Sequence, residues 1–202
     1  MARERAITED VEGLTYIEEL ISPDEERELL AFLEALDYRP VVMRGQAAKR
    51  TVRHFGLDYD YEHGELVPTD PLPPELAPLR DRCAALIERD PEDLVQILVS
   101  RYPEAAGIGW HRDAPMFGSR IAGVSLGAPC RMRFQRTVGG TRRVAAIELA
   151  PRSAYVLAGK ARWSWQHAIP ATKALRHSVT FRTLKRQGSS LPPVTPITSP
   201  VM

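Results

Sequence analysis

Two histidines and one carboxylate are spaced along the chain as the ligands of a metal ion could be. His111 and Asp113 are separated by one residue, and His167 follows much later. Residues at i and i+2 point to the same side of a strand, so His111 and Asp113 can converge on one cation, with His167 supplied by another strand. A nitrogen and oxygen donor set without thiolate fits iron(II) better than structural zinc. From the spacing alone, ordinary hydrogen-bonded histidines explain the pattern equally well. The spare His63 and His177 are interpreted as surface or loop residues.

Two arginines lie downstream of the second histidine. Arg176 and Arg182 are six residues apart, so on one continuous strand they would face the same side. A guanidinium binds both oxygens of a carboxylate and stays charged when buried, which suits a dicarboxylate co-substrate. The alternative is that either arginine is the solvated end of a strand. Iron, oxygen and an anionic co-substrate together predict an oxygenase.

The composition predicts one soluble globular domain that is not strongly basic. The chain has 202 residues, of which 44% are hydrophobic and 26% charged, and its formal net charge is +1. Any contact with nucleic acid therefore has to come from a local patch. Cys83 and Cys130 lack CxxC spacing, which favours two reduced structural cysteines. The apolar runs are too short for a membrane span and residues 1–10 are too charged for a signal peptide, so we expect a cytoplasmic protein.

The first helix has a clear start signal. After a flexible N-terminus at residues 1–12 and a short strand at 14–17, Ser22 can cap a helix that has Pro23 at its first position. Glu25 completes a capping box with Ser22. One face of the helix is apolar and consists of Leu29, Phe32, Leu33 and Leu36.

A second helix is expected after the proline-rich connection at residues 70–74. Its inner face consists of Leu76, Leu79, Cys83, Leu86 and Ile87. Between the two helices, residues 46–67 are rich in Arg, His and Tyr and follow no clean period, which indicates a loop or a hairpin.

From Leu94 onward, short strands dominate. Turn signals such as Gly139-Gly140 separate runs that are rich in β-branched and aromatic residues. These runs are residues 94–99, 121–126, 131–136, 144–149, 154–157 and 178–184. Many short strands after two helices predict a mainly β fold, closed or sandwiched, with the N-terminal helices packed on one side. The tail at 187–202, with four prolines, is expected to be disordered.

One of these strands carries a row of arginines. Arg131, Arg133 and Arg136 alternate with Met132 and Phe134, so one face should be apolar and the other cationic. The arginines could contact phosphate, or they could keep an exposed sheet face soluble.

The segments around these residues resemble a known family. The matching motifs are Arg101-Tyr102-Pro103, Gly107-Ile108-Gly109-Trp110-His111-Arg112-Asp113, Val124-Ser125-Leu126-Gly127 leading to Phe134, Trp165-Gln166-His167-Ala168-Ile169-Pro170, and Arg176-His177-Ser178-Val179-Thr180-Phe181-Arg182. In this order they resemble the AlkB family of 2-oxoglutarate and iron(II)-dependent dioxygenases. The resemblance spans residues 13–186, and the last motif, Arg-x-Ser-x-Thr-Phe-Arg, is its most specific part.

The resemblance implies a fold and a metal site. The fold would be a double-stranded β-helix, or jelly roll, buttressed by N-terminal helices. Carried over residue by residue, His111, Asp113 and His167 would bind iron(II).

The resemblance also implies a co-substrate site. Arg182 would hold the carboxylate of 2-oxoglutarate that lies near the metal, and Arg176 with Tyr102 would hold the distal one. Ser178, from the same motif, belongs to this co-substrate set.

The implied reaction uses molecular oxygen and converts 2-oxoglutarate to succinate and carbon dioxide while a carbon–hydrogen bond of the substrate is hydroxylated. If that carbon is an N-methyl group of a nucleic acid, formaldehyde leaves. Three positions depart from the nucleobase-repair members: Ser100 replaces a usual asparagine, Ala168 a usual glycine, and Ala114-Pro115 the acidic residues that help to read the damaged base. Neither Ala114 nor Pro115 has a side-chain acceptor, which leaves the methylated base undefined.

Residues 49–67 fall where the family places its substrate lid. Arg53, His54 and Tyr59 are the candidate substrate residues, because arginines interleaved with aromatics suit backbone contact and base stacking. The alternative is a solvated loop whose aromatics pack on the core.

Three functions are therefore compared. The first is oxidative demethylation of N-alkylated nucleic acid, DNA or RNA. The second is the same oxygenase chemistry on a protein side chain or a small molecule, which the near-neutral charge and the missing acids favour. The third is a binding module without activity, which the complete set of ligand and arginine candidates disfavours.

Overall fold

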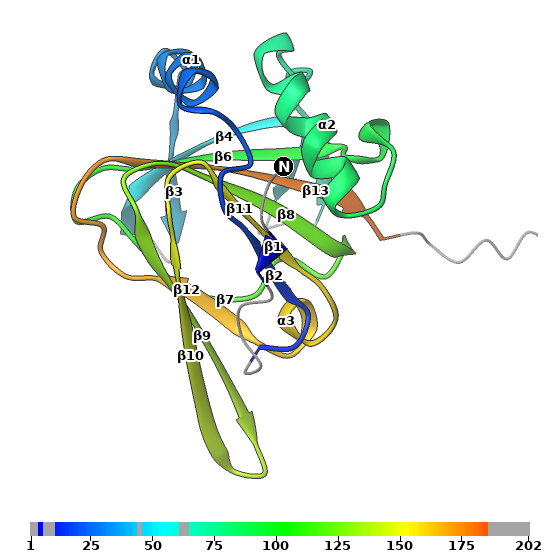
Figure 1. The fold of residues 1–202 in the computed structure, drawn as a ribbon, viewed down its shortest axis with the longest axis vertical. Helices are drawn as coiled ribbons and strands as arrows, with labels where there is room; N and C mark the ends of the chain where they lie inside the picture. Colours follow the sequence, from blue (N-terminus) through cyan, green and yellow to red (C-terminus); the bar gives the residue numbers. More distant parts are fainter. Residues whose placement is uncertain (1–3, 6–10, 44–45, 61–64, 186–202) are drawn as a thin grey trace, which may run out of the picture.

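The computed structural model describes residues 4–5, 11–43, 46–60 and 65–185. Within these ranges the chain forms two facing β-sheets, with two α-helices on the outer side of the larger one (Figure 1). This arrangement is the predicted jelly roll with N-terminal helices. The expected tail at 187–202 and most of the expected N-terminal segment 1–12 lie outside the described residues, although Glu4–Arg5 pairs with residues 16–17.

The larger sheet has nine strands in the described part of the chain. Its strand order is β1-β2-β11-β8-β13-β6-β4-β3, with β5 paired to β4. The strands are β1 (Glu4–Arg5), β2 (Leu14–Ile17), β3 (Arg39–Met43), β4 (Gln46–Asp60), β5 (Glu65–Pro68), β6 (Gln96–Tyr102), β8 (Phe117–Gly127), β11 (Ser153–Leu157) and β13 (Arg176–Leu184). These neighbouring strands pair antiparallel.

The smaller sheet has four strands in the order β10-β9-β12-β7. They are β7 (Ile108–His111), β9 (Cys130–Val138), β10 (Thr141–Leu149) and β12 (Gln166–Ile169). The β9–β10 ribbon continues beyond the body of the molecule, as Figure 1 shows.

Two helices cover the outer side of the larger sheet. They are α1 (Pro23–Glu34) and α2 (Ala77–Leu86), and α2 follows the short 3-10 turn η1 (Pro74–Leu76). A second turn, η2 (Pro91–Asp93), leads into β6, and a short helix, α3 (Gly159–Trp163), precedes β12. In α1 the predicted capping box is present, because the Ser22 hydroxyl accepts from the Glu25 amide and the Glu25 carboxylate accepts from the Ser22 amide. No helix in the described ranges has the length and apolarity to cross a membrane.

The larger sheet separates two hydrophobic cores. On the helix side, Leu33, Leu79 and Cys83 pack against sheet residues such as Ile97 and Phe181. On the other side a second core lies between the two sheets, and its largest members are Tyr16, Tyr102, Met132, Phe134, Tyr155 and Trp165. The site candidates border this second core.

Two expectations need correction. His177 is neither a surface nor a loop residue, since it lies in β13 with 1% of its surface exposed. Arg136 does not share the cationic face with Arg131 and Arg133. Strand alternation turns Arg136 to the side of Phe134, where its guanidinium lies 4.8 Å from the Trp165 ring.

Of the two forms expected for residues 46–67, a loop or a hairpin, the structure shows the hairpin. Strand β4 is 15 residues long and pairs with β3, β5 and β6, while residues 61–64 lie outside the described part.

Candidate functional site

A small cavity between the two sheets brings most of the predicted site residues together. Its volume is about 50 Å³. The candidates that line it are Tyr102, His111, Asp113, His167, Ser178 and Arg182. They come from β6, β7 and the loop after it, β12 and β13, so the site exists only in the folded chain.

The two histidines form a cross-strand pair. His111 ends β7 and His167 lies in β12, directly opposite in the antiparallel register. Their ring centroids are 4.2 Å apart. The Nδ1 atom of His111 lies 2.9 Å from the carbonyl oxygen of Gly109, which leaves Nε2 as the ring nitrogen available to a ligand. The sheet therefore fixes two nitrogen donors side by side.

Asp113 reaches the cavity from a loop, not from a strand. Strand β7 ends at His111, so the expected alternation along one strand does not explain how the carboxylate approaches the histidines. Its Oδ2 atom is 3.6 Å from His167 Nε2, and its Oδ1 atom accepts from Arg182 Nε at 2.9 Å.

A buried arginine that the sequence did not single out holds this loop. Arg162 of α3 is 2% exposed, and its guanidinium donates to four backbone carbonyls. The acceptors are Asp113 at 3.0 Å, Ala114 at 2.8 Å, Gly118 at 3.2 Å and Phe117 at 3.4 Å. Because all four acceptors lie in residues 113–118, one side chain determines the path of the segment that presents Asp113.

The charges in the cavity keep the three side chains in metal-binding protonation states. Burial alone would raise the pKa of Asp113, but the Arg182 guanidinium, with His167 and His111, holds it well below its usual range. Burial lowers the pKa of His167 to about 3, with a further contribution from His111. Burial also lowers the pKa of His111, against the opposing charge of Asp113. A carboxylate and two neutral imidazoles are the forms that bind a divalent cation.

These residues fit an iron site by donor type. Two imidazole nitrogens and one carboxylate are the donor set of non-haem iron(II), and all three side chains line one cavity. The described residues do not stand in a closed three-ligand arrangement, because Asp113 faces Arg182 as well as His167. A metal ion would have to compete with that ion pair for the carboxylate.

Arg176 fits an anionic ligand by its lack of partners. It has no exposed surface, its Nε donates to the Ser125 hydroxyl at 3.2 Å, and both terminal nitrogens lack a hydrogen-bond partner in the described structure. Its guanidinium lies 4.9 Å from the Tyr102 ring. A buried cation with two unused donor groups costs free energy unless a ligand satisfies it, and a carboxylate does so with both oxygens.

Two of the expected substrate residues, Arg53 and His54, do not line the cavity. Arg53 forms an ion pair with Asp70 on the face of β4 that points away from the cavity. The Nδ1 atom of His54 lies 3.1 Å from the Asp58 carboxylate. The side chain of Tyr59 lies outside the described residues.

Instead, the same segment presents Arg50 to the cavity. Arg50 is 9% exposed, donates to the Ser100 hydroxyl at 3.0 Å and lies 5.9 Å from the Tyr102 ring. Arg50 belongs to the arginine-rich segment, but the sequence did not indicate it as a candidate substrate residue. The register in which β4 pairs with β6 determines which arginine of β4 points toward the cavity. This register cannot be predicted from the sequence of β4 alone.

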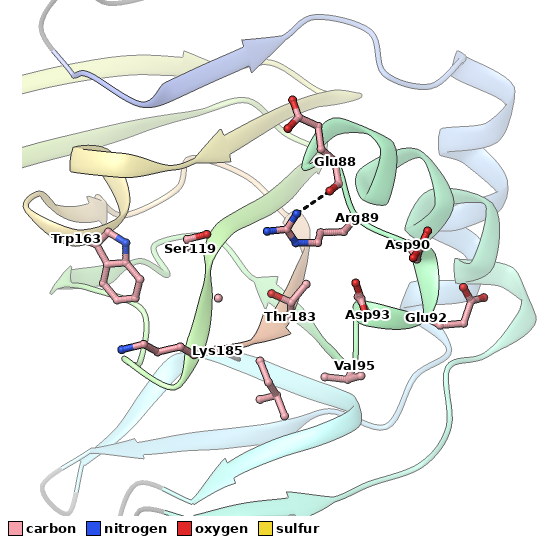
Figure 2. A pocket seen from close by; sticks show the side chains of 12 residues that line it. Glu88, Arg89, Asp90, Glu92, Asp93, Val95, Ser119, Trp163, Thr183 and Lys185 are labelled. Atoms are coloured by element: carbon pink, nitrogen blue, oxygen red, sulfur yellow. Dashed lines mark hydrogen bonds between the residues drawn. The ribbon is translucent and has the colours of Figure 1, made fainter. Parts of the chain in front are cut away.

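A larger pocket lies elsewhere on the molecule. Its volume is about 790 Å³, and it is lined by the segment around η2, the start of β8, Trp163 and the end of β13 (Figure 2). Its side chains include Glu88, Asp90, Glu92 and Asp93, but no histidine. Size alone would favour this pocket, but His111, Asp113 and His167 converge on the small cavity, which is therefore the candidate site.

Comparison with known proteins agrees with this geometry. Residues 13–187 match the family model described as the 2OG-Fe(II) oxygenase superfamily. A solved structure of OsALKBH1 superposes with a TM-score of 0.64 at 16% identity, covering 85% of this chain and 96% of that one, which supports the fold.

Several sequence relatives carry AlkB-type names. The chain is 30% identical over 172 residues to tRNA (carboxymethyluridine(34)-5-O)-methyltransferase alkbh8 of Xenopus tropicalis, covering 80% of this chain and 26% of that protein. It is 27% identical over 207 residues to the Alkylated DNA repair protein ALKBH8 homolog of Arabidopsis thaliana, covering 90% of this chain and 58% of that protein. The chain thus spans about a quarter of the frog relative and less than two thirds of the plant one.

The fold, the matched motifs and the family model lead to the same assignment. The chain belongs to the 2OG-Fe(II) oxygenase superfamily and is a 2-oxoglutarate-dependent dioxygenase.

Proposed function

We propose that this dioxygenase removes N-alkyl groups from nucleic acid, DNA or RNA, with release of formaldehyde, succinate and carbon dioxide. The observation that carries the proposal is the shared cavity of His111, Asp113 and His167, with Arg182 beside it and the unsatisfied Arg176 behind it. The names of two relatives refer to tRNA and to alkylated DNA, which supports nucleic acid as the substrate class.

In this proposal His111, Asp113 and His167 hold iron(II), which when bound supplies the activation of molecular oxygen. The neutral imidazoles donate lone pairs, and the low pKa of Asp113 keeps its carboxylate charged. Cross-strand pairing orients the histidines, and Arg162 orients the aspartate through its backbone.

The co-substrate is held by the arginines of β13. Arg182 binds the carboxylate of 2-oxoglutarate near the metal, and Arg176 binds the distal one beside Tyr102, with Ser178 between them on the strand. Both guanidinium groups lie in a buried environment, where a charge-assisted hydrogen bond to a carboxylate is stronger than it would be in water. The surrounding core excludes water from the reacting atoms.

A second candidate substrate is a protein side chain or a small molecule. It is favoured by the absence of a side-chain acceptor at Ala114 and by the use of the Ala114 carbonyl as an acceptor for Arg162. The segment after Asp113 therefore offers few groups that could read a damaged base.

The test is a turnover assay with iron(II), 2-oxoglutarate and oxygen, supplied with methylated or unmethylated single-stranded DNA or RNA. Formaldehyde and succinate that depend on the methylated strand support the proposal. Succinate without formaldehyde, whichever strand is present, would contradict the demethylase and direct the search to the second candidate. His167→Ala should abolish turnover in every arm, whereas His54→Ala, outside the cavity, should retain it.

A further inference from the structure

The outer face of the smaller sheet carries two arginines that have no carboxylate partner in the described part of the chain. Arg133 of β9 and Arg142 of β10 both approach the ring of Trp110 in β7, at 5.4 and 5.9 Å from its centroid. We call these three residues the arginine face. Arg142 also donates to Gln135 Oε1 at 2.5 Å, and Gln135 donates to Gln166 at 2.9 Å. Both arginines are exposed and both guanidinium groups contact the Trp110 ring, while the Gln135 amide also holds that of Arg142.

Many other arginines in the described part of the chain form ion pairs. Examples are Arg27 with Asp24, Arg80 with Asp81, Arg82 with Glu25 and Arg120 with Glu88. Arg133 and Arg142 have no carboxylate within 4 Å among the residues that the structure describes.

The charge is local to the ribbon. Residues 130–149 contain five arginines and one acidic residue, Glu148, so they carry a charge of +4 in a chain whose net charge is +1. The rest of the chain is therefore slightly acidic, and a polyanion would approach the ribbon in preference to other surfaces.

This face lies directly behind the site. Trp110 precedes His111 in β7, and Arg133 pairs with Ala168, the neighbour of His167. The smaller sheet has the order β10-β9-β12-β7, so a chain that crosses the arginine face from Arg142 to Trp110 reaches the border strand that carries His111.

The size of the cavity explains why such a surface is needed. At about 50 Å³ the cavity cannot hold a sugar-phosphate backbone, so the phosphates of a bound strand would have to lie outside it. An enzyme that acts on a base extrudes it into a pocket and leaves the phosphates outside, where fixed cations hold them.

We infer that the arginine face binds the phosphates of a single-stranded nucleic acid while one base enters the cavity. This inference rests on the proposed function and adds the surface that positions the strand. Arg133 and Arg142 each neutralise one phosphate, and Trp110 keeps their guanidinium groups fixed.

The test measures binding of a labelled, unmethylated single strand by fluorescence anisotropy at several salt concentrations, in separate DNA and RNA arms. Each phosphate contact on a single strand contributes roughly 0.7 to the slope of log affinity against log salt. The double variant Arg133→Gln/Arg142→Gln should therefore lower the slope by about 1.4 and weaken binding about 25-fold at 0.1 M salt. Binding in one arm alone identifies the sugar as well as the phosphate.

Two controls separate a local contact from a general charge effect. Arg27→Gln/Arg80→Gln changes the net charge equally but removes paired arginines, and it should leave the slope unchanged. Arg133→Lys/Arg142→Lys keeps the charges and should retain most of the slope. An unchanged slope in the Gln double variant, an equal loss in the Arg27/Arg80 control, or no binding of either strand by the unmodified protein would overturn the inference.

Separate assays of succinate and formaldehyde test the proposed function. Succinate formed without nucleic acid, and formaldehyde formed from a methylated mononucleoside, do not depend on phosphate contacts. If the arginine-face variants retain both activities and lose only turnover of the methylated strand through a raised KM, the face acts as inferred. Strand binding that needs the arginine face, without formaldehyde from any methylated substrate, would contradict the demethylase alone.

Discussion

Replacing Arg162 with methionine should strongly destabilise the fold. The guanidinium is 2% exposed and donates to the carbonyls of Asp113, Ala114, Phe117 and Gly118. A hydrogen bond from a charged donor contributes about 1.5 to 3 kcal/mol, and the two shortest of these bonds alone give about 4 kcal/mol. Methionine leaves the carbonyls without their donor.

Thermal unfolding followed by circular dichroism measures this loss. For a domain of this size, about 4 kcal/mol corresponds to a fall in Tm of about 8 to 16 °C. Arg162→Lys should recover part of it, since an ammonium keeps the charge but cannot reach four carbonyls in the planar geometry of a guanidinium. Arg112→Met is the matched control, because Arg112 is exposed and makes one long bond, 3.4 Å to the Trp163 carbonyl.

The same variant should also weaken metal binding if Asp113 is a ligand as proposed. The loop that carries Asp113 would lose its main tether, while the histidine pair would remain in the sheet. Iron(II) affinity, measured on folded protein at low temperature, should fall for Arg162→Met and not for Arg112→Met. A Tm within 2 °C of the unmodified protein, roughly the shift from less than 1 kcal/mol, would refute the reasoning.

Three further predictions concern other parts of the molecule. Burial lowers the pKa of His177 from 6.5 to about 4. The unfolded chain therefore binds this proton at a higher pH than the folded protein does, and stability is lost as the pH falls from 6.5 through 4. In urea unfolding, the unmodified protein should lose about 2 kcal/mol between pH 7 and pH 5, and His177→Asn should not show this loss. Without ligand, the Tm of Arg176→Met should be equal to or higher than that of the unmodified protein, because the substitution removes an unsatisfied buried charge. The variant should, however, lose the rise in Tm that 2-oxoglutarate produces. A lower Tm without ligand would show that the charge of Arg176 is already compensated. In Gly123→Ala the new Cβ would lie 2.3 Å from the Tyr155 ring, and the free energy of unfolding measured with denaturant should fall by about 2 kcal/mol. In Gly109→Ala the new Cβ meets no atom within 4 Å, and the free energy of unfolding should fall by less than about 0.5 kcal/mol. Equal losses would contradict the packing argument.

The parts of the fold that depend on local signals could be predicted from the sequence. The capping box of α1 involves residues three apart, and the strands β8, β9, β10, β11 and β13 each contain an apolar run that was recognised. By contrast, β7 and β12 are four residues long, contain Gly109 and Gln166, and are strands because they pair with each other and with β9. Their existence depends on contacts far apart in the chain.

The same distinction applies to the site. The motif order indicated which histidines and arginines to examine, and the cavity contains most of them. The sequence could not indicate Arg162, because nothing local distinguishes an arginine that meets four carbonyls from one in water. Nor could it indicate that Arg50 rather than Arg53 turns toward the cavity, since this depends on the face of β4 that meets β6.

The division of the interior by the larger sheet has a consequence for how this protein can change. The helix-side core of Leu33, Leu79 and Phe181 and the core around Met132 and Trp165 share strands but few side chains. Substitutions under α1 and α2 can therefore accumulate, or be introduced to raise stability, without displacing the two histidines. The outer helices are thus the natural place for evolutionary drift and for engineering, while the chemistry is inherited largely unaltered on the opposite side.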